Sequence, residues 1–200
     1  MEFIHLGQRV CKDIISGDLV NSLNKKIDDT IARNEQIDYS KQLSAKIKTE
    51  YDVADILKEV DSTQQIPGLL EKAHSSFSHD NSFNWSVKFY AGWGNDQKEG
   101  EYQIVHKHSG ASPLGYSLIL FLKVPNFGPE YQNNKWPTNG RTVIFGNCGG
   151  QLSMTHITIE PTVGDIYIFP YDMEHIVYPF RGDGMRRSIS CNFDLIASER

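Results

Sequence analysis

The feature that most constrains the fold is a series of short segments rich in β-branched and aromatic residues, which begins near residue 84. Gly, Pro, Asn and Asp punctuate the series, and no segment with helical periodicity interrupts it. Strands that follow one another without intervening helices favour a closed or sandwiched antiparallel sheet. Eight strands are predicted, at residues 84–94, 101–107, 115–124, 141–147, 154–160, 164–169, 174–179 and 186–194.

The N-terminal part of the chain follows a helical pattern instead. Leu19, Leu23, Ile27 and Ile31 recur at intervals that place them on one face of a helix. The same pattern returns further along. Helices are therefore predicted within residues 19–35, 51–60 and 66–76.

Length and composition fit one globular domain. The chain has 200 residues, of which 39% are hydrophobic, so it can bury a sizeable core. We expect a single α+β domain over residues 1–200, with a helical layer at 1–80 packed on a β-barrel or jelly-roll core at 81–200. The formal net charge of -5 argues against nucleic acid as the main partner, because neutralising phosphates requires a basic surface.

Three cysteines, Cys11, Cys148 and Cys191, are widely spaced and indicate neither a disulfide framework nor a zinc site. The first twenty residues carry charges among their apolar positions, unlike a signal peptide, and no apolar run has the length of a membrane span. We therefore expect a cytoplasmic protein that does not enter a membrane.

Three histidines are candidates for a metal site. His106 and His108 are separated by one residue at the end of a predicted strand, and alternate side chains of a strand point the same way. His175 follows a later strand, and closure of the sheet could return it to the first two. Neutral imidazoles suit an exchangeable iron, copper or zinc ion with open coordination positions. The alternative is that these are ordinary solvent-facing strand histidines.

The last predicted strand begins with RRSISCN, and its phase allows two interpretations. Arg186, Ser188, Ser190 and Asn192 share one face of the strand. If that face points inward, the guanidinium needs an anionic partner, and a ligand carboxylate bound by Arg186 and Ser188 would provide one. Arg187 would then lie exposed on the opposite face and tolerate replacement. In the other interpretation the polar face meets solvent, while Ile189 and Cys191 fill the core.

Five motifs occur in an order that resembles the iron(II)- and 2-oxoglutarate-dependent dioxygenases. The similarity covers most of the chain from about residue 40 and is greatest to the prolyl-4-hydroxylase-like branch of bacteria and marine bacteriophages. Residues 42–53, QLSAKIKTEYDV, also resemble a segment that precedes the barrel in that branch. The five motifs are H-x-H at 106–108, YSLILFLKVP at 116–125, PTVGDIYIFP at 161–170, EHIVYPF at 174–180 and RRSISCN at 186–192.

The resemblance implies a double-stranded β-helix with Fe(II) as cofactor and 2-oxoglutarate and O2 as co-substrates. It assigns the metal to His106, His108 and His175, and the remote carboxylate of 2-oxoglutarate to Arg186 and Ser188. His108 departs from the family, which has a carboxylate there. A tyrosine that helps to hold the co-substrate is also missing, and its position falls at Leu120 or Phe121.

The function that the resemblance implies is hydroxylation of a C–H bond coupled to oxidative decarboxylation of 2-oxoglutarate to succinate. Peptidyl proline is the first candidate substrate, a free amino acid or a nucleobase is a further possibility, and a virus-encoded enzyme acting in a host cytoplasm fits the branch. No catalytic side chain beyond the metal ligands is predicted. Two alternatives remain open: a non-catalytic barrel that binds a metal or a small acid, and a triple-histidine dioxygenase that does not use 2-oxoglutarate.

Aromatic residues and one long loop complete the list of candidates. Tyr90, Trp93 and Tyr102 could line a substrate entrance, although aromatic residues on strands more often pack in cores. The segment 125–140 is polar, rich in turn residues and too long for a simple hairpin, so we interpret it as a functional loop or lid.

Overall fold

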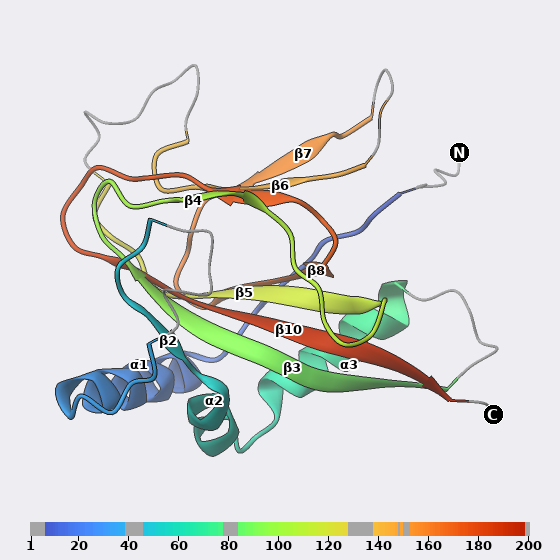
Figure 1. The fold of residues 1–200 in the computed structure, drawn as a ribbon, viewed down its shortest axis with the longest axis horizontal. Helices are drawn as coiled ribbons and strands as arrows, with labels where there is room; N and C mark the ends of the chain where they lie inside the picture. The colour runs from blue at the N-terminus through green and yellow to red at the C-terminus, as the bar shows by residue number, and fades with distance from the viewer. Residues whose placement is uncertain are drawn as a thin grey trace.

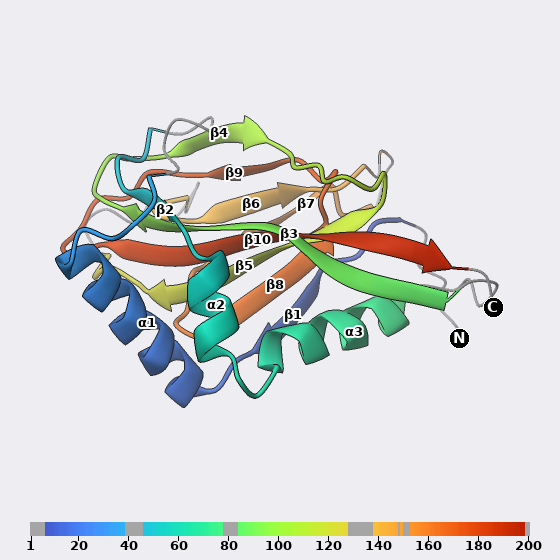
Figure 2. The same ribbon diagram turned by 60° about the horizontal axis from the view of Figure 1, so that its bottom comes forward.

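In the computed structural model, the described residues are 7–38, 46–77, 84–127, 138–147, 149 and 153–198. They form two antiparallel sheets packed face to face, and helices cover the outer face of the larger sheet (Figure 1, Figure 2). In chain order the elements are β1 (Cys11–Ile14), α1 (Gly17–Ala32), β2 (Glu50–Asp52), α2 (Ala54–Val60), α3 (Gln65–Phe77), β3 (Asn84–Gln97), β4 (Gln103–His106), β5 (Gly115–Lys123), β6 (Thr142–Phe145), β7 (His156–Ile159), β8 (Asp165–Pro170), β9 (His175–Val177) and β10 (Arg186–Ser198).

The chain passes back and forth between the two sheets, as in a jelly roll. The larger sheet has the order β1-β8-β5-β10-β3-β2, and the smaller has the order β4-β9-β6-β7. Each of the eight predicted strands has an observed counterpart, from β3 to β10. The α+β class and the double-stranded β-helix are therefore confirmed.

The N-terminal part is less purely helical than its periodicity suggests. The helices α1, α2 and α3 form within or close to the predicted ranges, but β1 and β2 also lie in this part and pair with the larger sheet, and β2 includes residues 51 and 52 of the predicted helix 51–60. Each of these strands has three or four residues, too few to display a side-chain period of two.

The larger sheet is buried on both faces, and β5 shows how the sequence achieves this. Leu118 and Leu120 pack beneath the helices, in the cluster that includes Leu23 of α1. Ile119 and Phe121 point the other way, into the cluster between the sheets. Each fully buried side chain of this size contributes about 1.5–3 kcal/mol to folding. The helices thus cover one face, which leaves the space between the sheets for a functional site.

None of the helices in the described ranges is long and apolar enough to span a membrane. Residues 128–137 of the predicted loop 125–140 lie outside the described residues, as does Cys148. Residues 42–45, the start of the segment that resembles the family's pre-barrel region, also lie outside them.

Candidate metal and anion site

Three imidazoles meet between the two sheets. His106 ends β4 and His175 begins β9, and the two residues are directly paired in the smaller sheet. His108 follows β4 and turns back to the same place. One nitrogen from each ring lies within 4.8 Å of the other two. Since a metal–nitrogen bond is about 2.0–2.1 Å long, the nitrogens have to move only slightly closer together for a single ion to contact all three rings.

Hydrogen bonds fix which nitrogen of two rings is available. Nδ1 of His106 donates to the carbonyl oxygen of Ile104 at 2.7 Å, and Nδ1 of His175 donates to that of Met173 at 3.1 Å. Because these carbonyls can only accept, each ring carries its proton on Nδ1 and offers the lone pair of Nε2.

All three rings favour the neutral form. Burial lowers the pKa of all three, and the neighbouring imidazoles lower those of His108 and His175 further, to about 2 and about 4. Nε2 of His108 lies 3.2 Å from Nε2 of His175. Neutral nitrogen donors this close to one another suit a divalent transition metal.

His108 joins the histidine cluster from a loop and not from a strand, so the alternation of side chains along a strand does not explain its position. β4 ends at His106, so His108 lies in the connection to β5. Its backbone N–H donates to the carbonyl oxygen of Tyr171 at 2.8 Å, and its ring packs beside Trp93 at 5.1 Å between centroids. The expectation that a single strand presents both histidines is therefore wrong, because the loop determines where His108 lies.

A buried guanidinium faces the same space between the sheets. Arg186 is 2% exposed and donates to the carbonyl oxygen of Gly140 at 2.9 Å and to Oγ1 of Thr142 at 3.3 Å. Its guanidinium also lies over the ring of Phe121, 5.2 Å from the centroid. Burial lowers its pKa only to about 10, so the group remains a cation at neutral pH. Its Nε has no hydrogen-bond partner, and none of the described carboxylates pairs with it.

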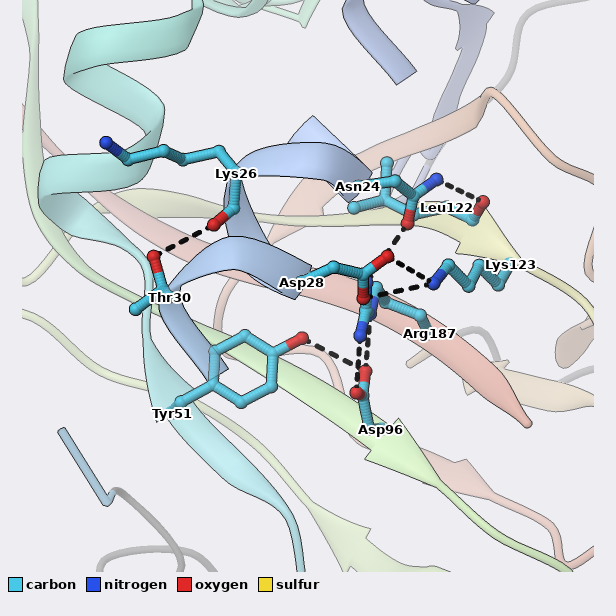
Figure 3. Close-up of polar contacts among 9 residues, drawn as sticks. All are labelled: Asn24, Lys26, Asp28, Thr30, Tyr51, Asp96, Leu122, Lys123 and Arg187. Atoms are coloured by element: carbon cyan, nitrogen blue, oxygen red, sulfur yellow. Dashed lines mark hydrogen bonds and ion pairs between the residues drawn. The ribbon is translucent and has the colours of Figure 1, made fainter. Parts of the chain in front are cut away.

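The prediction that Arg187 is exposed to solvent is wrong. Arg187 is 1% exposed, and its Nε and Nη2 each lie 2.7 Å from an oxygen of Asp96 (Figure 3). Its Nη1 donates to Asp28 at 2.7 Å, and the hydroxyl of Tyr51 donates to Asp96 at 3.0 Å. The prediction failed because it assumed that the face away from the pocket meets solvent, whereas α1 covers that face and supplies Asp28.

The two interpretations of β10 are each half right. Ser188 and Asn192 are buried on the face toward the smaller sheet, where Asn192 accepts a hydrogen bond from Ser117 at 2.7 Å. Ile189 and Cys191 are buried on the other face, beneath the helices. The polar face therefore lines an enclosed space, and the apolar face fills a core at the same time.

Two polar residues that were not predicted lie beside this face. Asn95 is paired with Ser188 and Gln97 with Arg186 along β3 and β10. Both are buried, and neither Oδ1 of Asn95 nor Oε1 of Gln97 has a hydrogen-bond partner. The predicted strand 84–94 ended just short of both. Extending the alternation of Trp93 by two and four residues would have found them.

The three aromatic candidates do not form one surface. Trp93 is 3% exposed and lies against His108, so it belongs to the wall of the histidine cluster. Tyr90 and Tyr102 are 51% and 36% exposed, on β3 and immediately before β4. Only Trp93 of the three therefore touches the histidine cluster among the described contacts.

The sequence profile of the 2OG-Fe(II) oxygenase family matches residues 91–192, which are 102 of the 200 residues and include all three histidines and Arg186. The chain belongs to this family. It is therefore an oxygenase that uses Fe(II) with 2-oxoglutarate as co-substrate, and three of its histidines form a group that could hold a metal ion. No curated protein matches the chain.

Solved structures similar to this oxygenase share its fold at low sequence identity. A prolyl-4-hydroxylase from Pseudomonas putida has a TM-score of 0.60 at 15% identity, over 94% of this chain and 91% of the other. The viral collagen prolyl hydroxylase of Paramecium Bursaria Chlorella virus-1 has a TM-score of 0.55 at 16% identity, over 91% and 95%. The epimerase SnoN from nogalamycin biosynthesis has a TM-score of 0.64 at 12% identity, over 96% and 81%.

The donor set of this oxygenase fits the family's cofactor and co-substrate. Three neutral imidazoles can hold Fe(II) and leave coordination positions open. A buried guanidinium that has only neutral hydrogen-bond acceptors among the described residues fits a dicarboxylate, because a cation removed from water needs an anion nearby.

Proposed function

We propose that His106, His108 and His175 hold Fe(II), and that Arg186 binds the remote carboxylate of 2-oxoglutarate with help from Ser188. One observation carries the proposal. Three neutral imidazoles and a buried guanidinium without a carboxylate partner face the same space between the sheets. A structural role for either group alone would not require the other.

When bound, Fe(II) supplies the activation of O2 and the oxidative decarboxylation of 2-oxoglutarate. The residues of the chain orient the ligands and keep water out. The carbonyls of Ile104 and Met173 fix the rings of His106 and His175. Trp93 and Phe169 pack against His108 and His175 and limit the access of water.

Arg186 is already oriented before any ligand binds. Its contacts with Gly140 and Thr142 and its position over Phe121 hold the guanidinium plane in place. A carboxylate then meets a rigid pair of donors and does not have to order a flexible side chain. Phe121 is paired with Ser188, and it occupies the inward position where the family often has a tyrosine. Phe121 offers no hydroxyl to the co-substrate, and its ring instead stacks on the guanidinium of Arg186.

We propose hydroxylation of a peptidyl proline as the reaction. Support comes from the bacterial and viral prolyl hydroxylases that share the fold. SnoN, an epimerase, shares the fold as well, so the same scaffold also suits a small-molecule substrate, which is the second candidate.

The test presents iron, 2-oxoglutarate and O2 to the protein with a library of proline-containing peptides and with free amino acids. We expect a mass increase of one oxygen atom on a peptide, localised to proline and absent with the His106→Ala variant. A product from a free amino acid would favour the second candidate. Succinate formation that no peptide and no amino acid stimulates would contradict both.

We also propose that residues 1–80 and 81–200 form one domain, since β1, β2 and α1 are built into the larger sheet and its core. A single cooperative unfolding transition, followed by both far-ultraviolet circular dichroism and tryptophan fluorescence, is the expected result. Two separate transitions would contradict it.

A further inference from the structure

A buried carboxylate accepts two backbone hydrogen bonds from the connection that carries His108. Asp194 of β10 accepts hydrogen bonds from the backbone N–H groups of Ala111 and Ser112, at 3.3 and 3.2 Å. Asp194 is 4% exposed, and it takes part in none of the salt bridges among the described residues. A buried carboxylate needs hydrogen bonds to its oxygens. The loop and the carboxylate therefore stabilise each other.

Gly110 shows how closely the loop approaches this carboxylate. A Cβ atom at position 110 would collide with Oδ1 of Asp194. The φ angle of Gly110 is not in the positive range, so an alanine could adopt its backbone conformation. Glycine is therefore needed here for close approach to Asp194.

Two further contacts connect the anchored loop to the histidine. The hydroxyl of Tyr171 donates to the carbonyl oxygen of Ser112, and the carbonyl oxygen of Tyr171 accepts the backbone N–H of His108 at 2.8 Å. The hydroxyl of Ser112 also donates to the carbonyl oxygen of Leu195 at 2.8 Å. Since His108 lies beyond the end of β4, these contacts do for His108 what strand pairing does for His106.

We infer that Asp194 is a positioning residue for the metal site: it fixes the loop that presents the His108 ring. The inference rests on the proposed metal site and adds a residue to it. Asp194 and Arg186 fall on the same face of β10, eight residues apart, because alternate residues of a strand share a face. β10 therefore carries the proposed co-substrate anchor, Arg186, at its start and the residue that positions His108 further along the same face.

The test measures Co(II) affinity, from the visible absorption of the bound ion, in purified full-length variants. Asp194→Asn keeps the shape but turns one oxygen into an amide N–H that faces a backbone N–H. Gly110→Ala pushes the carboxylate away without changing its charge. We expect each to weaken Co(II) binding about 10–100-fold and to change the absorption spectrum, as loss of an outer contact to a metal ligand does. The matched control is Asp165→Asn, which removes a buried carboxylate of β8 that pairs with Lys12 of β1. It should change stability and leave Co(II) affinity unaltered.

A double-mutant cycle with His108→Ala separates positioning from a general effect on the fold. If Asp194 acts through His108, Asp194→Asn should not lower further the weak residual Co(II) affinity that His106 and His175 retain in the His108→Ala background. A full effect in that background would overturn the inference, as would wild-type affinity in both Asp194→Asn and Gly110→Ala when His108→Ala is weakened. Wild-type protein whose Co(II) binding does not depend on His106 and His175 would overturn the proposed metal site itself.

Discussion

Replacing Arg186 with methionine should weaken 2-oxoglutarate binding without lowering the stability of the fold. The same replacement of its neighbour Arg187 should lower stability instead. Arg186 is fully buried, and its two hydrogen bonds go to neutral acceptors, Gly140 and Thr142. Its charge is therefore not compensated in the protein without ligand. Exchanging a buried charge for an apolar side chain of similar volume is often neutral or stabilising. We expect the Arg186→Met variant to fold with unchanged or higher stability.

The Arg186→Met variant should lose affinity for 2-oxoglutarate. Removing one partner of a buried charge pair costs about 2–5 kcal/mol of binding free energy. Since about 1.4 kcal/mol corresponds to a tenfold change, affinity should fall roughly 30-fold or more. Arg186→Lys keeps the charge without the planar fork and should recover only part of the loss.

Arg187→Met leaves the carboxylate of Asp96 buried without a cation, with Tyr51 as its remaining hydrogen-bond donor in Figure 3. Breaking such a pair costs about 3–5 kcal/mol of stability. The measurements are urea denaturation of both variants and calorimetric titration of 2-oxoglutarate in the presence of Ni(II). Wild-type affinity in Arg186→Met, or a larger affinity loss in a stable Arg187→Met protein, would refute the reasoning.

Three further predictions concern the histidines and a buried acid. His106→Ala and His175→Ala should each abolish stoichiometric iron binding but not folding, because each removes one of three ligands; elemental analysis checks this, and wild-type iron content would contradict it. His108→Asp restores the family's usual carboxylate and should still bind iron; loss of all metal would show that the three-imidazole geometry is required. Glu50, buried on β2 beside Gln103, has its pKa raised to about 7, mainly by burial. Because the folded protein holds this proton more tightly than the unfolded chain, Glu50 costs stability as the pH rises from 4.5 to 7. Glu50→Gln should therefore be more stable than wild type by about 1–2 kcal/mol at pH 8 but equal at pH 4, and equal stability at both pH values in urea denaturation would contradict the assignment.

The sequence predicts the core strands of this fold well because their local amino-acid composition is typical of buried strands. The segments 115–124 and 164–169 each contain a continuous run of apolar and aromatic residues, at 118–122 and 166–169, and such a run favours a strand that is buried on both faces. The strands β1 and β2 have no such signature. Their pairing with β8 and β3 is decided by backbone hydrogen bonds over three or four residues.

Long-range partners explain what the sequence could not predict. The burial of Arg187 depends on Asp96, 91 residues away along the chain, and on α1 covering that face. Asp194 likewise lies in the last strand, 82 residues after the Ser112 N–H that it accepts. A periodic pattern predicts which face of a strand a side chain lies on, but it does not predict which charged residue from a distant part of the chain pairs with it there.

The central claim is that the three histidines and Arg186 form one iron and 2-oxoglutarate site. Its most direct test is an anaerobic titration of the protein with Fe(II) and then 2-oxoglutarate, followed by visible absorption, with succinate measured after O2 is admitted. We expect a weak metal-to-ligand charge-transfer band that saturates at one equivalent of each, and succinate afterwards. The band should be absent in His175→Ala and should require a much higher 2-oxoglutarate concentration in Arg186→Met. Iron that binds to the wild-type protein without any band at saturating 2-oxoglutarate, and without succinate formation, would contradict the claim.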